Sequence, residues 1–227
     1  MTKKSNFLII WDFDGVIADT EKLWLQTRME LLNKVYGLNW DMNTVNNFLG
    51  GMSDKTKQEV LLKLGIKTDE EFWKEALRLD MEKMLKGFAL TDGIRDIFDL
   101  SYIEQCIATG GIASKTEQKI KMVGIENYFP PQKVFTADMV AYGKPEPDLF
   151  LLAAESMGFE PQNCIVVEDS VAGLTAAQRA KMIPIAFIGS DLYDKANYTS
   201  RIKNMGINNI FDNMSDVKIF IENIINN

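Results

Sequence analysis

Apolar positions follow two different periods along the chain, and the period changes near residues 20 and 87. The short apolar run at residues 7–11 ends at acidic residues and a glycine, which predicts a buried parallel strand. From about residue 20 to residue 86 the spacing is helical, and no segment there has the pattern of a strand. The first helix of this region carries an apolar stripe: Leu23, Leu31, Leu32 and Val35.

Capping residues mark where the helices of this region begin and end. Gly37 is expected to close the first helix. Ser53 is the expected cap of a second helix, and Thr68 with Glu71 forms a capping-box pattern that would open a third. Residues 20–86 therefore predict an all-helical insert.

After this insert, strand and helix patterns alternate to the end of the chain. The predicted strands are residues 102–108, 133–136, 163–167, 183–187 and 210–211. The predicted helices are residues 91–100, 114–123, 147–157, 170–180 and a last one from residue 215. Such alternation is typical of a parallel sheet with helices on both faces. We therefore predict an α/β protein: residues 1–18 and 87–227 form a Rossmann-like core, and residues 19–86 form a small helical cap domain.

The amino-acid composition limits which catalytic groups the protein can use. The 227 residues include no histidine, which excludes a Ser-His-Asp triad, a Cys-His pair and a His-ligated zinc. Cys106 and Cys164 lie in apolar runs that predict strands, so both are expected to be buried reduced thiols. Chemistry must then rest on carboxylates, hydroxyls, lysine and a hard metal ion.

Charge and hydropathy restrict the partners. The formal net charge of −7 argues against nucleic acid or an anionic membrane surface as the main partner. The apolar run at the start is too short for a signal sequence, and no stretch approaches the roughly 18 apolar residues of a membrane span. We expect a cytoplasmic protein that is a monomer or a weak homodimer.

Polar side chains gather where the predicted strands end, and ligands of open parallel sheets bind at that edge. The segments are Asp12-Phe13-Asp14-Gly15, Thr109-Gly110-Gly111, Gly143-Lys144-Pro145 and Glu168-Asp169-Ser170. Clustered carboxylates would repel one another without a cation, and Mg²⁺ with oxygen ligands resolves this repulsion. Exposed N–H groups after Thr109 and the ammonium of Lys144 suit phosphate oxygens. Taken singly, each segment has a plain alternative: a solvated loop aspartate or helix cap, a strand-to-helix turn, or a surface lysine.

Taken together and in this order, the four segments resemble the haloacid dehalogenase superfamily, in its phosphatase and phosphomutase branch with a helical cap. Asp-Phe-Asp-Gly-Val from Asp12 matches the first motif of that family, and Thr109 matches the second. Lys144 in Gly-Lys-Pro-Glu-Pro matches the third, and Val-Val-Glu-Asp-Ser, which contains Glu168, matches the fourth. The resemblance extends from about residue 7 to residue 187.

The resemblance implies a role for each matched residue. Asp12 would be the nucleophile, and Asp14 would be the acid and then the base, a role that requires a raised pKa. Thr109 and Lys144 would bind the transferring phosphoryl group, with Gly110 as a further substrate contact. The metal ligands would be the carboxylates of Asp12, Asp169 and Glu168, the last directly or through water, and the backbone carbonyl of Asp14.

The cap would set the substrate. Its candidate contacts are Glu21, Trp24 and the turn at residues 50–53, although Trp24 and Trp73 are also good candidates for the core of the cap. The predicted function is a magnesium-dependent phosphatase that acts on a small phosphorylated metabolite, such as a sugar phosphate, through an aspartyl-phosphate.

Two alternatives to a phosphatase remain open. A sugar phosphomutase related to beta-phosphoglucomutase is disfavoured because the related mutases use a cap histidine near the position of Trp24, and the chain has none. A phospho-receiver or other non-hydrolytic binding protein is disfavoured by the insert and by Asp14, because a receiver must retain its phosphate. Asp14 also argues against a dehalogenase.

Overall fold

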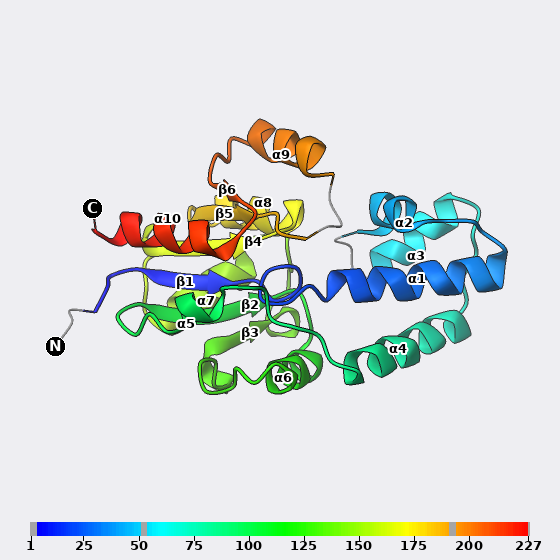
Figure 1. The fold of residues 1–227 in the computed structure, drawn as a ribbon, viewed down its shortest axis with the longest axis horizontal. Coiled ribbons are helices and arrows are strands. Elements are labelled where there is room, and N and C mark those ends of the chain that lie inside the picture. The colour runs from blue at the N-terminus through cyan, green and yellow to red at the C-terminus, as the bar shows by residue number, and fades with distance from the viewer. Residues whose placement is uncertain (1–3, 51–53, 191–193, 227) are drawn as a thin grey trace. The chain divides into compact units, whose positions relative to one another are not determined.

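The computed structural model describes residues 4–50, 54–190 and 194–226 (Figure 1). The chain divides into two compact units. Residues 1–18 and 89–227 form an α/β unit, and residues 19–88 form a helical unit. Ser53 and the turn residues 51–52, which entered the sequence analysis, lie outside the described residues.

The α/β unit is built on a six-stranded parallel sheet with the order β3-β2-β1-β4-β5-β6. The strands are β1 (Leu8–Trp11), β2 (Glu104–Thr109), β3 (Val134–Thr136), β4 (Cys164–Glu168), β5 (Ile183–Phe187) and β6 (Ile210–Phe211). Near-continuous apolar runs are typical of strands that are covered on both faces. The predicted α/β class with a Rossmann-like sheet is confirmed.

The central strand β1 is completely buried between its two neighbours. Ile10 pairs in register with Cys106 of β2 and with Val166 of β4, and Leu8 pairs with Cys164 of β4. Both cysteines are free and buried, as predicted. Burial raises the pKa of Cys106, and it raises the pKa of Cys164 to about 11, so neither thiol is ionised at neutral pH.

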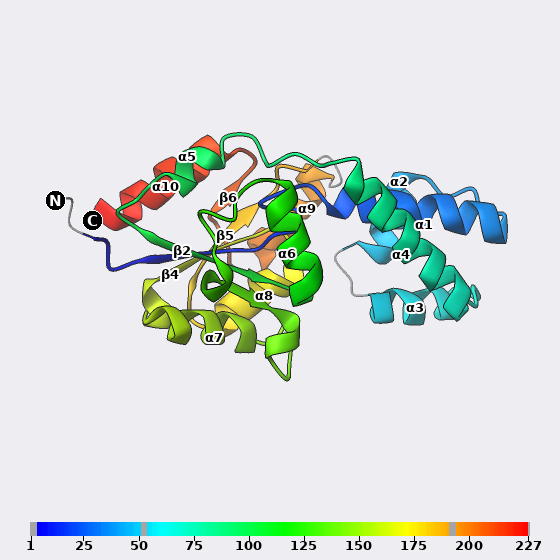
Figure 2. The same ribbon diagram turned by 90° about the horizontal axis from the view of Figure 1, so that it is seen from below.

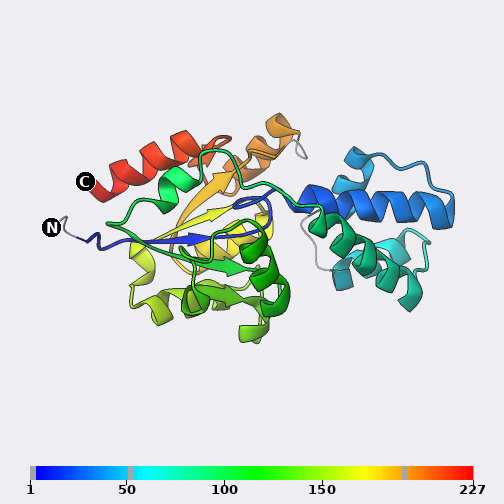
Figure 3. The ribbon, with the colours of Figure 1, turned by 60° about the horizontal axis from the view of Figure 1, so that its bottom comes forward.

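Helices cover both faces of the sheet (Figure 2). On one face, α7 (Asp148–Met157) and α8 (Val171–Arg179) bury alanine and large apolar side chains against β1, β2 and β4. On the other face, α5 (Arg95–Phe98) and α10 (Met214–Asn226) lie beside each other, and Phe98 packs edge-on against the indole of Trp11. Figure 3 shows the same two layers from an intermediate angle. Two more α-helices of this unit are α6 (Ala113–Met122), which contacts β3, and α9 (Lys195–Asn204).

The helical unit contains α1 (Glu21–Tyr36), α2 (Met42–Leu49), α3 (Asp54–Lys63) and α4 (Glu70–Leu85). α1 packs against α2 and α4, and it carries a buried arginine: Arg28 donates to Asp80 of α4 at 2.6 Å and to Asp54 of α3 at 3.1 Å. Within the described part of the chain, no helix has both the length and the hydropathy needed to cross a membrane.

Two details of the helical unit differ from prediction. The helix that was expected to be capped by Thr68 is capped by Asp69, whose carboxylate accepts from Phe72 N at 2.8 Å, while Thr68 Oγ1 accepts from the Trp73 indole. Neighbouring Thr and Asp are both good caps, so sequence alone does not choose between them. Val35 was placed on the apolar stripe of α1 but is 55% exposed. Gly37 ends α1 in the left-handed conformation, as predicted.

The α/β unit also departs from prediction in places. The helix expected at residues 91–100 is reduced to α5, because Gly93 lies in the left-handed region at φ 79° and interrupts it. The helices α2 and α9 were not predicted, since both are short and rich in polar residues. β2 begins at Glu104 rather than at residue 102 and ends at Thr109.

Candidate active site

The loop after β1 brings the first two aspartates to the carboxyl edge of the sheet. Asp12 N donates to Val167 O at 3.0 Å, so Asp12 still lies along β4, and the chain then turns back so that Ala18 N donates to Phe13 O at 3.1 Å. The turn requires Gly15, whose φ is +87°. A Cβ atom at Gly15 would lie 2.0 Å from Asp169 Oδ2, so this glycine also lets the loop approach the end of β4 closely.

Lys144 joins the loops after β1 and β4. Its ammonium donates to Asp12 Oδ1 at 2.5 Å and to Glu168 Oε2 at 2.6 Å, and its side chain is only 9% exposed. The same ammonium lies 4.9 Å from the centre of the Phe150 ring. The sequence placed Lys144 in a rigid loop at this edge, and the structure places it in direct contact with the predicted nucleophile.

Both carboxylate oxygens of Glu168 accept hydrogen bonds. While Oε2 accepts from Lys144, Oε1 accepts from the backbone and the hydroxyl of Ser170 at 3.0 and 2.9 Å. Ser170 in turn caps α8 by accepting from Gly173 N at 3.0 Å. The helix start therefore orients a buried carboxylate toward the same point as Asp12.

Three carboxylates at this edge could hold a cation. Asp12, Glu168 and Asp169 each offer an oxygen, and these three atoms lie within 4.8 Å of one another, all buried. Burial and the neighbouring Glu168 together raise the pKa of Asp12 to about 7, against the opposing effect of Lys144. Burial by itself would lower the pKa of Lys144, but the Asp12 and Glu168 carboxylates together raise it. Three acids against one ammonium leave an excess of negative charge, and oxygen ligands of this kind suit a hard divalent ion.

Thr109 lies where it was predicted, at the end of β2. Its side chain is buried, and its hydroxyl accepts from Gly111 N at 3.2 Å, which curls the following loop back over the strand end. Gly110 between them is exposed. The loop after Thr109 thus begins at the carboxyl edge of the sheet, beside the loop that follows β1.

Asp14 has a partner that the sequence analysis missed. Lys119 of α6 donates to both oxygens of the Asp14 carboxylate, at 2.8 Å to Oδ1 and 2.6 Å to Oδ2. A sequence signal existed: Lys119 shares a face of α6 with Thr116, Ile120 and Val123, where an apolar residue is expected. The side chain of Lys119 is 5% exposed.

Tyr198 of α9 is a second contact that was not predicted. Its hydroxyl donates to the backbone carbonyl of Asp169 at 2.5 Å. Burial raises the pKa of Tyr198, and the charges of Asp169 and Glu168 raise it further, so the phenol stays protonated and remains a donor. α9 escaped prediction, and this contact therefore had no signal in the sequence.

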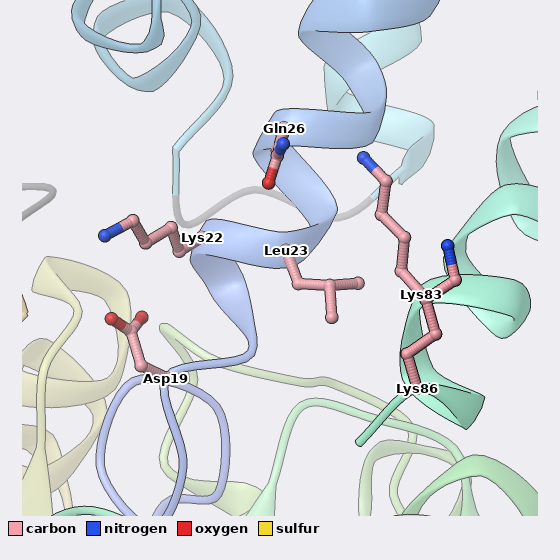
Figure 4. Close-up of a pocket in the computed structure, with 6 residues that line it drawn as sticks. All are labelled: Asp19, Lys22, Leu23, Gln26, Lys83 and Lys86. Carbon is pink, nitrogen blue, oxygen red and sulfur yellow. The ribbon is translucent and has the colours of Figure 1, made fainter. Parts of the chain in front are cut away.

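The predicted cap contacts lie in the helical unit. Glu21 and Trp24 are both half-buried in the first turn of α1. A hollow of about 350 Å³ opens beside that turn, lined by Asp19, Lys22, Leu23, Gln26, Lys83 and Lys86 (Figure 4). Substrate contacts by Glu21 and Trp24 stay a prediction.

The placement of the acidic residues in the sheet defines the class of protein. Chain connections leave β1 toward β2 and β3 on one side, and β4, β5 and β6 follow on the other side. Doubly wound sheets bind ligands at such a switch point, and Asp12 and Glu168 lie at the ends of the two strands that flank it. The fold and the site together define a doubly wound α/β protein with a buried acidic centre, bridged by a lysine, at its switch point.

The chain belongs to the family of haloacid dehalogenase-like hydrolases, whose model matches residues 9–187. It is 29% identical over 178 residues to the fructose-1-phosphate phosphatase YqaB of Escherichia coli, covering 77% of this chain and 92% of that protein. A phosphorylated carbohydrates phosphatase of Thermotoga maritima is 26% identical over 176 residues, covering 76% and 80%.

A solved structure agrees over nearly the full length. A conserved haloacid dehalogenase-like protein of unknown function from Agrobacterium tumefaciens matches with a TM-score of 0.85 and 26% identity, covering 96% of this chain and 98% of that one. The predicted family is confirmed, and so is the prediction of an enzyme of the phosphoric monoester hydrolase class.

Proposed function

We propose that the chain is a magnesium-dependent phosphatase that hydrolyses a small phosphorylated sugar or similar metabolite through an aspartyl-phosphate on Asp12. The observation that carries the proposal is the meeting of Asp12, Lys144 and Glu168 at the carboxyl edge of the sheet, with Asp169 beside them. Two relatives named for phosphatase activity on phosphorylated sugars support the substrate class.

The proposed reaction has two steps. A carboxylate oxygen of Asp12 attacks phosphorus, and the bond from phosphorus to the alcohol oxygen breaks as Asp14 gives that oxygen a proton. Water then attacks the aspartyl-phosphate, Asp14 takes a proton from the water, and inorganic phosphate leaves with Asp12 restored. Thr109 and Lys144 bind the transferring group and stabilise its charge.

The carboxylates of Asp12, Asp169 and Glu168 would hold the metal, with the backbone carbonyl of Asp14. When bound, Mg²⁺ offsets the negative charge of these acids and of the phosphoryl oxygens. Lys144 bridges Asp12 and Glu168 in the structure, so it is already within reach of a phosphoryl group on Asp12.

The helical unit is proposed to act as a cap that selects the substrate. Its lysine-lined hollow suits an anionic or polyhydroxylated leaving group, since Lys22 and Lys86 bring ammonium groups and Gln26 brings an amide. The cytoplasmic location and the monomer or weak dimer expected from the sequence stay predictions.

One experiment tests the proposal. The wild type is assayed for phosphate release from a panel of sugar phosphates with Mg²⁺ and with EDTA, beside Asp12→Asn. We expect release that depends on Mg²⁺ and is lost by at least about 10³-fold in Asp12→Asn, since the nucleophile is removed. Full activity of Asp12→Asn would remove Asp12 from the role of nucleophile. Isomerised sugar phosphate without net phosphate release would indicate a mutase.

A further inference from the structure

Lys119 is a buried cation that the proposed reaction does not use. It lies in the middle of α6 on the side turned to the core, beside Thr116 and Ile120. Burying an ammonium is unfavourable unless it is paired, and a leucine at this position would fill the space without that penalty. The reason for a lysine at position 119 must therefore lie in the groups with which its ammonium is paired.

The contacts of Lys119 converge on the predicted acid and base. Its ammonium holds both oxygens of Asp14, and it lies 4.5 Å from the centre of the Phe13 ring, the residue between the two aspartates. It also borders the loop after β2, where a Cβ atom at Gly111 would lie 3.8 Å from Nζ. Lys119 thus contacts the loop that carries Asp14 and lies beside the loop that follows Thr109.

The two hydrogen bonds from Lys119 restrict the Asp14 carboxylate. An aspartate in a loop samples several rotamers, and a bidentate contact with a buried cation selects one of them. Catalysis by a proton donor is sensitive to placement, because a shift of about 1 Å can lower a rate about 100-fold. The gain in rate from a fixed Asp14 can therefore offset the free-energy cost of burying the Lys119 ammonium.

We propose that Lys119 is a positioning residue for Asp14, which it orients for proton transfer to and from the substrate. The inference rests on the proposed function, because it assigns Asp14 the part of acid and base. It adds a residue from α6 to the machinery of the site.

Leaving-group chemistry separates this role from a merely structural one. An alkyl phosphate needs a proton on its leaving oxygen, whereas p-nitrophenyl phosphate releases a phenolate that is stable without one. kcat/KM reports the first half of the reaction, in which that proton is given. A residue that positions the acid should affect kcat/KM for the alkyl ester far more than for the aryl ester.

The experiment compares Lys119→Met with the wild type on glycerol phosphate and on p-nitrophenyl phosphate with saturating Mg²⁺. We expect kcat/KM for the alkyl ester to fall by at least about tenfold and kcat/KM for the aryl ester to change by less than about threefold. In an Asp14→Asn background the same change should have little further effect. The matched control is Lys121→Met on the same helix, which removes an exposed ion pair with Glu117 and should leave both values unchanged.

The outcomes are separable from those of the proposed function. Equal losses on both esters, or none, in Lys119→Met would overturn the positioning role while the effect of Asp12→Asn still stood. Absence of phosphate release by the wild type would overturn the proposed function itself. Circular dichroism and the Tm establish that Lys119→Met is folded; should it not fold, Lys119→Gln is measured against the same expectations.

Discussion

Gly173 lies in the first turn of α8, where alanine would ordinarily be the better residue. Helix propensity favours alanine over glycine by about 1 kcal/mol within a helix. In this structure, however, a Cβ atom at Gly173 would lie 2.0 Å from Glu168 Oε2 and 2.1 Å from Glu168 Cδ. The buried carboxylate that accepts from Lys144 would have to move.

The sizes of the opposing free-energy terms determine whether Gly173→Ala stabilises or destabilises the protein. Overpacking of a tight interior destabilises by about 1–3 kcal/mol. A lost hydrogen bond between charged groups, here from Lys144 to Glu168, adds about 1.5–3 kcal/mol. Against the helical gain of about 1 kcal/mol, Gly173→Ala should therefore lower the free energy of unfolding by about 1.5–5 kcal/mol.

Calorimetry and urea unfolding in EDTA measure this change. The expected fall in Tm is on the order of 3–20 °C. Gly143→Ala is the matched control, because nothing lies within 4 Å of the Cβ position there, and it should change stability by no more than about 0.5 kcal/mol. A Gly173→Ala protein as stable as the wild type, or more stable, would refute the claim that this glycine makes room for Glu168.

Two further predictions concern charge and metal. Because the pKa of Asp12 is about 7 in the folded protein against an ordinary value of 3.8, the native state binds more protons between these values, so the metal-free protein should lose stability as pH rises from about 4 to 7. Asp12→Asn should flatten that slope of Tm against pH in EDTA; an unchanged slope would place its origin elsewhere. Tyr198→Phe removes the donor to the Asp169 carbonyl and should weaken Mg²⁺ affinity about tenfold, measured by the rise of Tm with Mg²⁺, whereas the exposed Tyr142→Phe should not. Equal Mg²⁺ affinities in the two variants would contradict a role for Tyr198 at the metal site.

The sequence made the carboxyl edge of the sheet predictable because its determinants are local. A short apolar run followed by Asp12 and then by Gly15 predicts a strand and then a turn. The apolar run before Glu168 and Asp169 likewise predicts the end of β4. Parallel strands place such ends at one edge whatever the details of packing. The position of Asp12 beside Glu168 follows from these rules.

The missing parts of the site depend on contacts distant in sequence. Lys119 meets Asp14 across 105 residues, and its burial results from tertiary packing that overrides the usual exposure of lysine. Tyr198 belongs to α9, a helix that buries a single residue, Ile202, and so has almost no apolar period to detect. Local patterns predict the edge where the side chains meet, but not which helices reach it.

Asp12 and Asp14 show how partners that are distant in sequence give different surroundings to side chains that are close in sequence. They lie two residues apart, yet the turn at Gly15 gives each its own lysine: Lys144 for Asp12 and Lys119 for Asp14. The Asp12 side chain is 8% exposed, and burial together with the neighbouring Glu168 raises its pKa, whereas the Asp14 side chain is 25% exposed and both its oxygens accept from Lys119. A cation bound at Asp12 would release Lys144 toward a phosphoryl group, while Lys119 would stay beside Asp14. The proposed roles of nucleophile and proton carrier can therefore differ between two identical side chains, because different helices and loops supply their partners.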